Sequence, residues 1–149
     1  MVLIKEIMSK TPHVIRSDMN LMEVCKLMKE ADTGFLPVSQ NGEKRNIIGV
    51  ITDRDLCIRA GAQAVDFKSA KVSEFLSKDI HFVCQNEDVG RAAQLMKECK
   101  CRRVLVFDDE KSKNLLGVLS LGDLAVVHEN EKLIFETLKE IYHAQPTPA

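Results

Sequence analysis

The sequence predicts an α+β fold, in which two copies of a β-α-β-β-α unit are related by a pseudo-two-fold axis and followed by a C-terminal helix. Three observations lead to this prediction. The chain has 149 residues, which is enough for a real hydrophobic core. Its two halves match without a gap when they are superimposed. Short apolar runs alternate with segments in which apolar residues recur every three or four positions, as in strands and helices.

The duplication holds one register over most of the chain. Residues 27–30 and 95–98 both read Leu-Met-Lys-Glu, and Gly-Val-Ile-Thr at 49–52 lies over Gly-Val-Leu-Ser at 117–120. Chance does not hold a single register through so many scattered identities, so the chain is an internal repeat. We expect the first repeat with its connector to span residues 1–68 and the second residues 69–128, with the C-terminal helix and a flexible tail at 129–149.

The first long helix of each repeat is predicted from the spacing of its apolar residues. These residues recur in steps of three and four from Leu21 to Ala31 and, in the second copy, from Val89 to Cys99. Such spacing gives a helix one buried face. Asn20 and Glu23 form a capping-box pattern that would start the first helix.

Three short apolar runs in each repeat are predicted to be strands, because nearly continuous apolar runs are typical of strands covered on both faces. They lie at about residues 14–15, 35–38, 47–51, 82–83, 104–107 and 115–119. A second helix is expected just after Thr52 and just after Ser120. One repeat of about 60 residues has a marginal core. We therefore expect the two repeats to pack face to face, with two clefts at the seam.

The C-terminal segment lies outside the duplication. Five apolar residues form a stripe that predicts a helix from about Glu131 to His143: Leu133, Ile134, Leu138, Ile141 and Tyr142. This stripe would either dock on the core or contact a second copy of the chain. Residues 145–149 are expected to be a frayed tail.

Composition excludes several classes of function. The net charge is −1 and no basic stripe stands out, so a nucleic-acid partner is not expected. No apolar run approaches the roughly 18–20 residues that span a bilayer, and charged residues interrupt the N-terminal segment, which predicts a cytoplasmic protein without a membrane partner. The five cysteines form no Cys-x-x-Cys pair, which favours structural thiols in a reducing compartment.

The residues with the most chemical information lie at the end of the last strand of each repeat. Thr52 is followed three residues later by Asp55, and Ser120 by Asp123. One interpretation is an N-cap, although an aspartate is shorter than the Glu or Gln that usually closes a capping box. The other is a nucleotide cradle, in which backbone N–H groups face phosphate and the carboxylate accepts hydrogen bonds from a ribose. Two copies in register favour the cradle.

The Gly-Val-Ile-Thr-x-x-Asp motif resembles that of the cystathionine-β-synthase (CBS) domain, as do Ile-Met-Ser-Lys-Thr-Pro at 7–12 and Gly-Phe-Leu-Pro-Val at 34–38. Over residues 3–127 the chain looks like a CBS pair, or Bateman module, and most like the small stand-alone bacterial proteins of this kind. The resemblance implies a regulatory fold that binds AMP, ADP, ATP or, less often, S-adenosylmethionine or an NAD-type ligand.

The resemblance also implies roles for individual residues. Asp55 and Asp123 would hold the ribose, while Thr52 and Ser120 approach ribose or phosphate. The opening segments of the repeats and the start of the middle strand would enclose the purine, with Thr11, Pro12, Val14, Phe35, Ile80 and His81 as the implied contacts. These segments differ between the two repeats, so the two sites would not be chemically equal.

Three arginines and two histidines have competing interpretations. Arg102 and Arg103 would either neutralise phosphate or form a solvated pair on a strand edge. Arg54 lies in the first turn of a helix, where its charge opposes the dipole, which suggests a ligand or dimer contact. His13 and His81 are equivalent in the duplication, but they have no common set of metal ligands, so no metal is expected.

Together these observations predict a binding module that is not an enzyme, because neither a nucleophile–base pair nor a Walker lysine is recognisable. The expected ligand is an adenine nucleotide in a regulatory role, and no cofactor is required. The alternative is a structural or protein-interaction module that acts by dimerisation while its clefts stay empty. We expect a homodimer with helices 21–30 and 89–97 along the shared edge, and the further candidate partner is an unidentified target protein.

Overall fold

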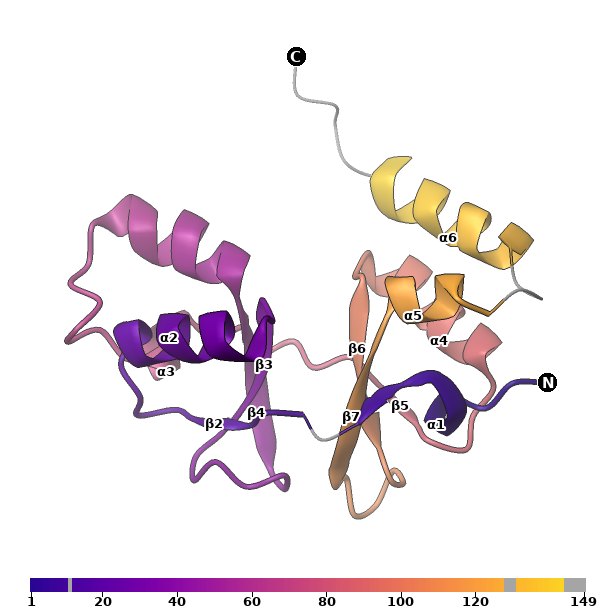
Figure 1. Cartoon of the computed structure of the whole chain (residues 1–149), viewed down its shortest axis with the longest axis horizontal. Helices are drawn as coiled ribbons and strands as arrows, with labels where there is room; N and C mark the ends of the chain where they lie inside the picture. Colours follow the sequence, from indigo (N-terminus) through magenta and orange to yellow (C-terminus); the bar gives the residue numbers. More distant parts are fainter. Residues whose placement is uncertain (11, 128–130, 144–149) are drawn as a thin grey trace. The chain divides into compact units, whose positions relative to one another are not determined.

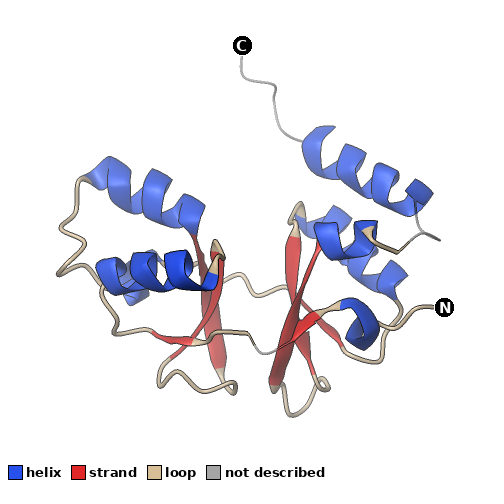
Figure 2. Ribbon diagram, in the orientation of Figure 1, coloured by secondary structure: helices blue, strands red, loops and turns tan. Residues whose placement is uncertain are grey.

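The computed structural model describes residues 1–10, 12–127 and 131–143, which separate into two compact units. The first unit runs from Pro12 to Ile80, and the second unit joins residues 1–10 to the described residues from His81 onward. In each unit the helices pack on one face of a small sheet (Figures 1 and 2). The mixed α+β fold predicted from the sequence is confirmed. The face-to-face pairing of the two repeats stays a prediction.

The first unit has a three-stranded sheet of order β2-β3-β4, with β2 parallel and β4 antiparallel to β3. Its strands are β2 (Ile15–Arg16), β3 (Phe35–Ser39) and β4 (Ile47–Thr52). Its helices are α2 (Leu21–Ala31), the π-helix η1 (Asp55–Ala60), the 3₁₀ turn η2 (Gly61–Gln63) and α3 (Val72–Phe75). The predicted strand–helix–strand–strand–helix order is therefore present.

The second unit repeats this arrangement and adds one strand, giving the order β1-β7-β6-β5. Its strands are β1 (Ser9–Lys10), β5 (Phe82–Cys84), β6 (Arg103–Phe107) and β7 (Leu115–Ser120). Its helices are α1 (Ile4–Ile7), α4 (Val89–Cys99), α5 (Leu121–Ala125) and α6 (Glu131–His143). Within the described part of the chain, no helix is long and apolar enough to cross a membrane.

The two sequence repeats exchange their opening segments. Ser9 of the first repeat pairs with Val118 in β7 of the second unit. Equivalently, Ser77 of the second repeat exchanges two backbone hydrogen bonds of 2.8 and 2.9 Å with Val50 in β4 of the first unit. Each compact unit therefore contains a segment from both sequence repeats, while the repeat boundaries 1–68 and 69–128 stay a prediction. An apolar pattern identifies a strand, but it does not say which strand will be its neighbour.

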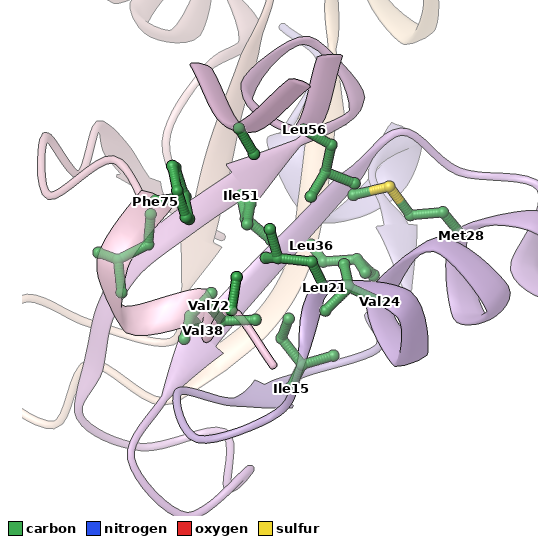
Figure 3. Close-up of a cluster of buried hydrophobic side chains, with 13 residues drawn as sticks. Ile15, Leu21, Val24, Met28, Leu36, Val38, Ile51, Leu56, Val72 and Phe75 are labelled. Atoms are coloured by element: carbon green, nitrogen blue, oxygen red, sulfur yellow. The ribbon is translucent and has the colours of Figure 1, made fainter. Parts of the chain in front are cut away.

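Each unit has its own hydrophobic core between the sheet and the helices. In the first unit, α2 contributes Leu21, Val24 and Met28, which pack against Leu36 and Ile51 of the sheet (Figure 3). The predicted capping box starts this helix. Asn20 Oδ1 accepts from Glu23 N at 2.9 Å, and Glu23 Oε2 accepts from Asn20 N at 3.0 Å.

The C-terminal helix α6 has the bounds predicted from its apolar stripe and docks on the second unit. Thr137 and Ile141 are buried, and the helix packs against α4. Phe135, Leu138 and Tyr142 stay exposed on α6. Docking on the core is therefore confirmed for one face of the helix only. The predicted tail at 145–149 lies outside the described residues.

Candidate functional site

The turn between β4 and η1 is closed by two reciprocal hydrogen bonds. Thr52 Oγ1 accepts from Asp55 N at 3.1 Å, and Asp55 Oδ2 accepts from Thr52 N at 3.0 Å. The turn is also fixed to the start of β3, because Asp53 N donates to Gly34 O at 2.9 Å. Phe35 lies opposite Thr52 in the register of β3 and β4. This part of the sheet therefore brings three residues implied by the resemblance, Phe35, Thr52 and Asp55, to one end of the unit.

The second unit has the same turn between β7 and α5. Ser120 Oγ accepts from Asp123 N at 3.1 Å, and Asp123 Oδ2 accepts from Ser120 N and from Ser120 Oγ, both at 2.7 Å. Leu121 N donates to Arg102 O at 2.9 Å, as Asp53 N does to Gly34 O in the first unit. Arg103 lies opposite Ser120 in the β6–β7 register.

These bonds show that an aspartate closes the capping box in both turns, although it is shorter than the Glu or Gln that usually does so. In both turns the carboxylate reaches the backbone N–H of the N-cap residue, so the cap accounts for the hydroxyl and for one carboxylate oxygen. Asp55 and Asp123 are partly buried, and the side chain of Asp55 is 16 % exposed. The cap therefore fixes each carboxylate while part of it still reaches the surface.

The basic residues near the two turns lie at the surface. Arg54 and Arg103 are both exposed. Arg54 lies two residues after Thr52 in the sequence, and Arg103 lies opposite Ser120 in the strand register. Arg102 Nη1 donates to the Tyr142 hydroxyl at 3.3 Å, so its guanidinium has a partner on α6. Of these three arginines, Arg54 and Arg103 are therefore the candidates for contacting the phosphate of a ligand.

The opening segments lie beside the motif strands but run away from the turns. β1 is antiparallel to β7, so Lys10 lies opposite Gly117, three residues before Ser120. Ile80 follows Ser77, which lies opposite Val50, and Thr11 lies outside the described residues. The described contacts do not bring Ile80 to a turn. Val14 directly precedes Ile15, which lies opposite Val38 in the parallel pair of β2 and β3, so Val14 lies toward the Phe35 end of β3.

His81 is held beside β6 by a backbone hydrogen bond. Its carbonyl accepts from Leu105 N at 2.9 Å, two residues along β6 from Arg103. Among the residues that the structure describes, no group of three or more His, Cys, Asp or Glu side chains could hold a metal ion.

Sequence reasoning missed Arg59, which lies beside Asp55. Its Nη1 is 3.7 Å from Asp55 Oδ1 and donates to Phe75 O at 2.7 Å. The signal was present, since an arginine four residues after an aspartate on a helix is a standard ion-pair spacing. The equivalent position in the second unit is Val127, which has no donor on its side chain.

Comparison with known proteins identifies relatives that cover nearly the whole chain. The family model of the CBS domain matches twice, at residues 4–60 and 72–134. The CBS domain-containing protein YhcV of Bacillus subtilis is 31% identical over 140 residues, which cover 94% of this chain and 95% of the relative.

Two solved structures have the same fold. The crystal structure of Hypoxic Response Protein I with two coordinated zinc ions has a TM-score of 0.70 at 26% identity, covering 84% of this chain and 98% of that one. The CBS domain pair of protein MJ0100, solved in complex with 5′-methylthioadenosine and S-adenosyl-L-methionine, has a TM-score of 0.71 at 25% identity, covering 83% and 97%.

Proposed function

Because the chain belongs to the CBS-domain family, we propose that it is a regulatory module that binds an adenosyl-containing ligand at the Thr52–Asp55 and Ser120–Asp123 turns. The observation that carries the proposal is the pair of equivalent, partly buried carboxylates. Each is held by the backbone of its own N-cap residue, at 3.0 Å in one unit and 2.7 Å in the other. Such a carboxylate is oriented before a ligand arrives, which lowers the entropic cost of binding.

The chemistry of the turn suits the ribose of a nucleoside. The cap uses Oδ2 of each aspartate, so Oδ1 can accept hydrogen bonds from the hydroxyls of a ribose diol. An ionised acceptor makes these bonds stronger than neutral ones. The MJ0100 domain pair was solved with two adenosyl compounds, and they share this ribose with the adenine nucleotides.

The charges around the turns favour ligands that carry phosphate. Arg54 lies two residues after Thr52, and Arg103 lies opposite Ser120; both are exposed. Arginine binds phosphate oxygens through two parallel hydrogen bonds. We therefore propose an adenine nucleotide of the AMP, ADP or ATP class, bound reversibly as a signal and not as a substrate.

Thermal unfolding with AMP, ADP, ATP, NAD, S-adenosylmethionine and 5′-methylthioadenosine tests the proposal. A ligand at 100 times its Kd adds about 2.7 kcal/mol to the free energy of unfolding. Asp55→Asn and Asp123→Asn should each remove binding at one turn, because the amide oxygen can keep the cap but no second acceptor remains for the diol. Asp53→Asn, an exposed neighbour of the first turn, is the matched control and should bind as the wild type does.

The proposal is overturned if none of these compounds stabilises the protein at millimolar concentration, or if the Asp55→Asn/Asp123→Asn double variant responds as the wild type does. A second function is favoured by the exposed apolar face of α6, which carries Phe135, Leu138 and Tyr142. In that case the chain is a protein-interaction module that acts by dimerisation. Loss of assembly on deletion of residues 129–149, with an unchanged ligand response in the double aspartate variant, would support it.

A further inference from the structure

The two candidate sites differ in what supports the carboxylate, and the difference lies at Arg59. We propose that Arg59 is the positioning residue of the first unit: it fixes Asp55 and couples the occupancy of this site to the backbone of residues 72–77. The second unit has Val127 at the equivalent position and lacks this coupling. The inference rests on the proposed function for the identity of the site. The coupling between Asp55, Arg59 and the backbone of residues 72–77 can nevertheless be tested without any ligand.

One guanidinium nitrogen has two partners from different parts of the chain. Arg59 Nη1 donates to Phe75 O at 2.7 Å and lies 3.7 Å from Asp55 Oδ1, the oxygen that the cap does not use. A ligand diol that binds Oδ1 would therefore meet the arginine as well as the carboxylate. Because the same nitrogen makes both contacts, a shift of the Asp55 carboxylate that moves Nη1 also changes the hydrogen bond from Nη1 to Phe75 O.

Phe75 connects this contact to the sheet. It is buried, it is the last residue of α3, and two residues later Ser77 exchanges two backbone hydrogen bonds with Val50. Val50 lies two residues before the N-cap residue Thr52 in β4. The contacts thus form a closed path from the carboxylate through Arg59 and the exchanged segment back to the strand that ends in the capping turn.

The helix that carries Arg59 also differs between the units. η1 is a π-helix over Asp55–Ala60, whereas α5 is a short α-helix over Leu121–Ala125. Gly61 N bonds to Leu56 O, five residues back, as the wider π turn requires. Single π turns are rare and often occur at functional sites. The two units therefore differ in helix geometry in the same segment in which the first unit has Arg59 and the second has Val127.

Amide hydrogen exchange in the ligand-free protein tests the link directly. Arg59→Gln should speed the exchange of the Val50 and Ser77 amides about tenfold, because it removes a charged hydrogen bond to Phe75 O that holds the backbone leading to Ser77. Arg59→Lys should restore part of the protection. Arg91→Gln is the matched control, since it removes an i,i+4 pair with Glu87 at similar exposure in the second unit. Unchanged exchange at Val50 and Ser77 in Arg59→Gln would overturn the inference.

Binding measurements in an Asp123→Asn background test the effect on the site, with AMP as the probe. Arg59→Gln should weaken AMP binding about tenfold, and Arg59→Lys should recover most of it. AMP should also slow the exchange of the Ser77 amide in the protein with Arg59 but not in Arg59→Gln. If Asp55→Asn abolishes binding while Arg59→Gln binds as tightly as its parent, the inference is wrong and the proposed function stands. If no adenosyl ligand binds the wild type, the proposed function fails. The hydrogen-exchange experiment on the ligand-free protein then decides alone whether Arg59 couples Asp55 to residues 72–77.

Discussion

Gly49 lies so close to Ser77 that a Cβ atom on the glycine would overlap the serine carbonyl oxygen. The second unit repeats this relationship, with the Cβ of a residue at Gly117 only 2.5 Å from Ser9 O. Both glycines begin the Gly-Val-x-Thr/Ser sequence that precedes the capping turns. The glycines therefore let the exchanged opening segment approach the strand closely. They affect the position of the turn only indirectly, through this contact.

Replacing either glycine should destabilise its unit. Gly49→Ala or Gly117→Ala must displace a backbone segment, and overpacking of this kind costs about 1–3 kcal/mol. Urea denaturation followed by circular dichroism measures the change. Gly61→Ala is the control, because Gly61 is helical and its Cβ would come no nearer than 3.4 Å to Leu56 O. Equal stability of Gly49→Ala and Gly61→Ala would contradict this role.

Sequence reasoning predicted the elements of the fold well, because each has a local signal. The apolar stripe of α6 gave its bounds of Glu131–His143, and the Asn20–Glu23 pattern gave the start of α2. Which segments become neighbours was not predictable in this way. The exchange of Ser9 and Ser77 between the repeats depends on long-range packing, although glycine inside a strand pattern is a known sign of close backbone approach.

The candidate site was predicted less completely. Thr52, Asp55, Ser120 and Asp123 were found because the duplication presents them twice. The length argument about aspartate failed, since Asp123 Oδ2 reaches Ser120 N at 2.7 Å. Residues with a role in only one unit leave no repeated signal, and Arg59 was overlooked for this reason.

The capping hydroxyls should contribute to stability apart from any ligand. Ser120 Oγ accepts from Asp123 N and donates to Asp123 Oδ2, so Ser120→Ala removes both bonds. Loss of an N-cap costs about 1 kcal/mol. Ser120→Thr keeps the hydroxyl and should lose much less. Thermal unfolding of the two variants beside the wild type measures the difference, and an unaltered transition in Ser120→Ala would refute the cap.

Asp109 should make stability depend on acid pH. Hydrogen bonds from the Ser112 backbone N–H, the Ser112 hydroxyl and the Lys111 N–H lower the pKa of Asp109 in the folded state. A lowered folded pKa means that the contribution is fully present above the unfolded value of about 3.9 and is lost as the pH falls through the folded value. The free energy of unfolding should therefore decrease below about pH 4.

Urea titrations between neutral pH and strongly acidic pH test this dependence. Asp109→Ala should flatten the decrease in part, because the variant lacks the Asp109 carboxylate but keeps that of Asp108, whose pKa is also lowered by hydrogen bonds. Glu110→Gln, which changes the exposed carboxylate next in sequence, is the control and should keep the decrease. A profile for Asp109→Ala that matches the wild type at every pH would rule out this contribution.

The cysteines should react at very different rates in the folded protein. Burial raises the pKa of the Cys101 thiol to about 11, while Cys57 is exposed. Since the thiolate is the reactive form, maleimide at neutral pH should label Cys57 quickly and Cys101 only after unfolding. Peptide mapping by mass spectrometry gives the rates. Equal labelling of both thiols under native conditions would show that Cys101 is accessible.

The last prediction concerns assembly through α6. One face of this helix is buried on the second unit through Thr137 and Ile141, and an adjacent face exposes Phe135 (63 % exposed), Leu138 (37 %) and Tyr142 (49 %). The expected dimer edge along residues 89–97 is thus partly covered by α6, because α6 packs on α4. We therefore expect α6 to take over this part of an isologous, two-fold interface.

Light scattering at micromolar concentration should give about twice the chain mass of 16.7 kDa. The double variant Phe135→Glu/Leu138→Glu should give a monomer, because two carboxylates on the apolar face would have to be desolvated in the interface. Val126→Glu places a charge on an apolar residue that is exposed but outside α6, so it should remain dimeric. A wild-type protein that is monomeric with and without AMP would exclude the dimer. A double variant that keeps the dimeric mass would instead move the interface away from α6, to the edge lined by α2.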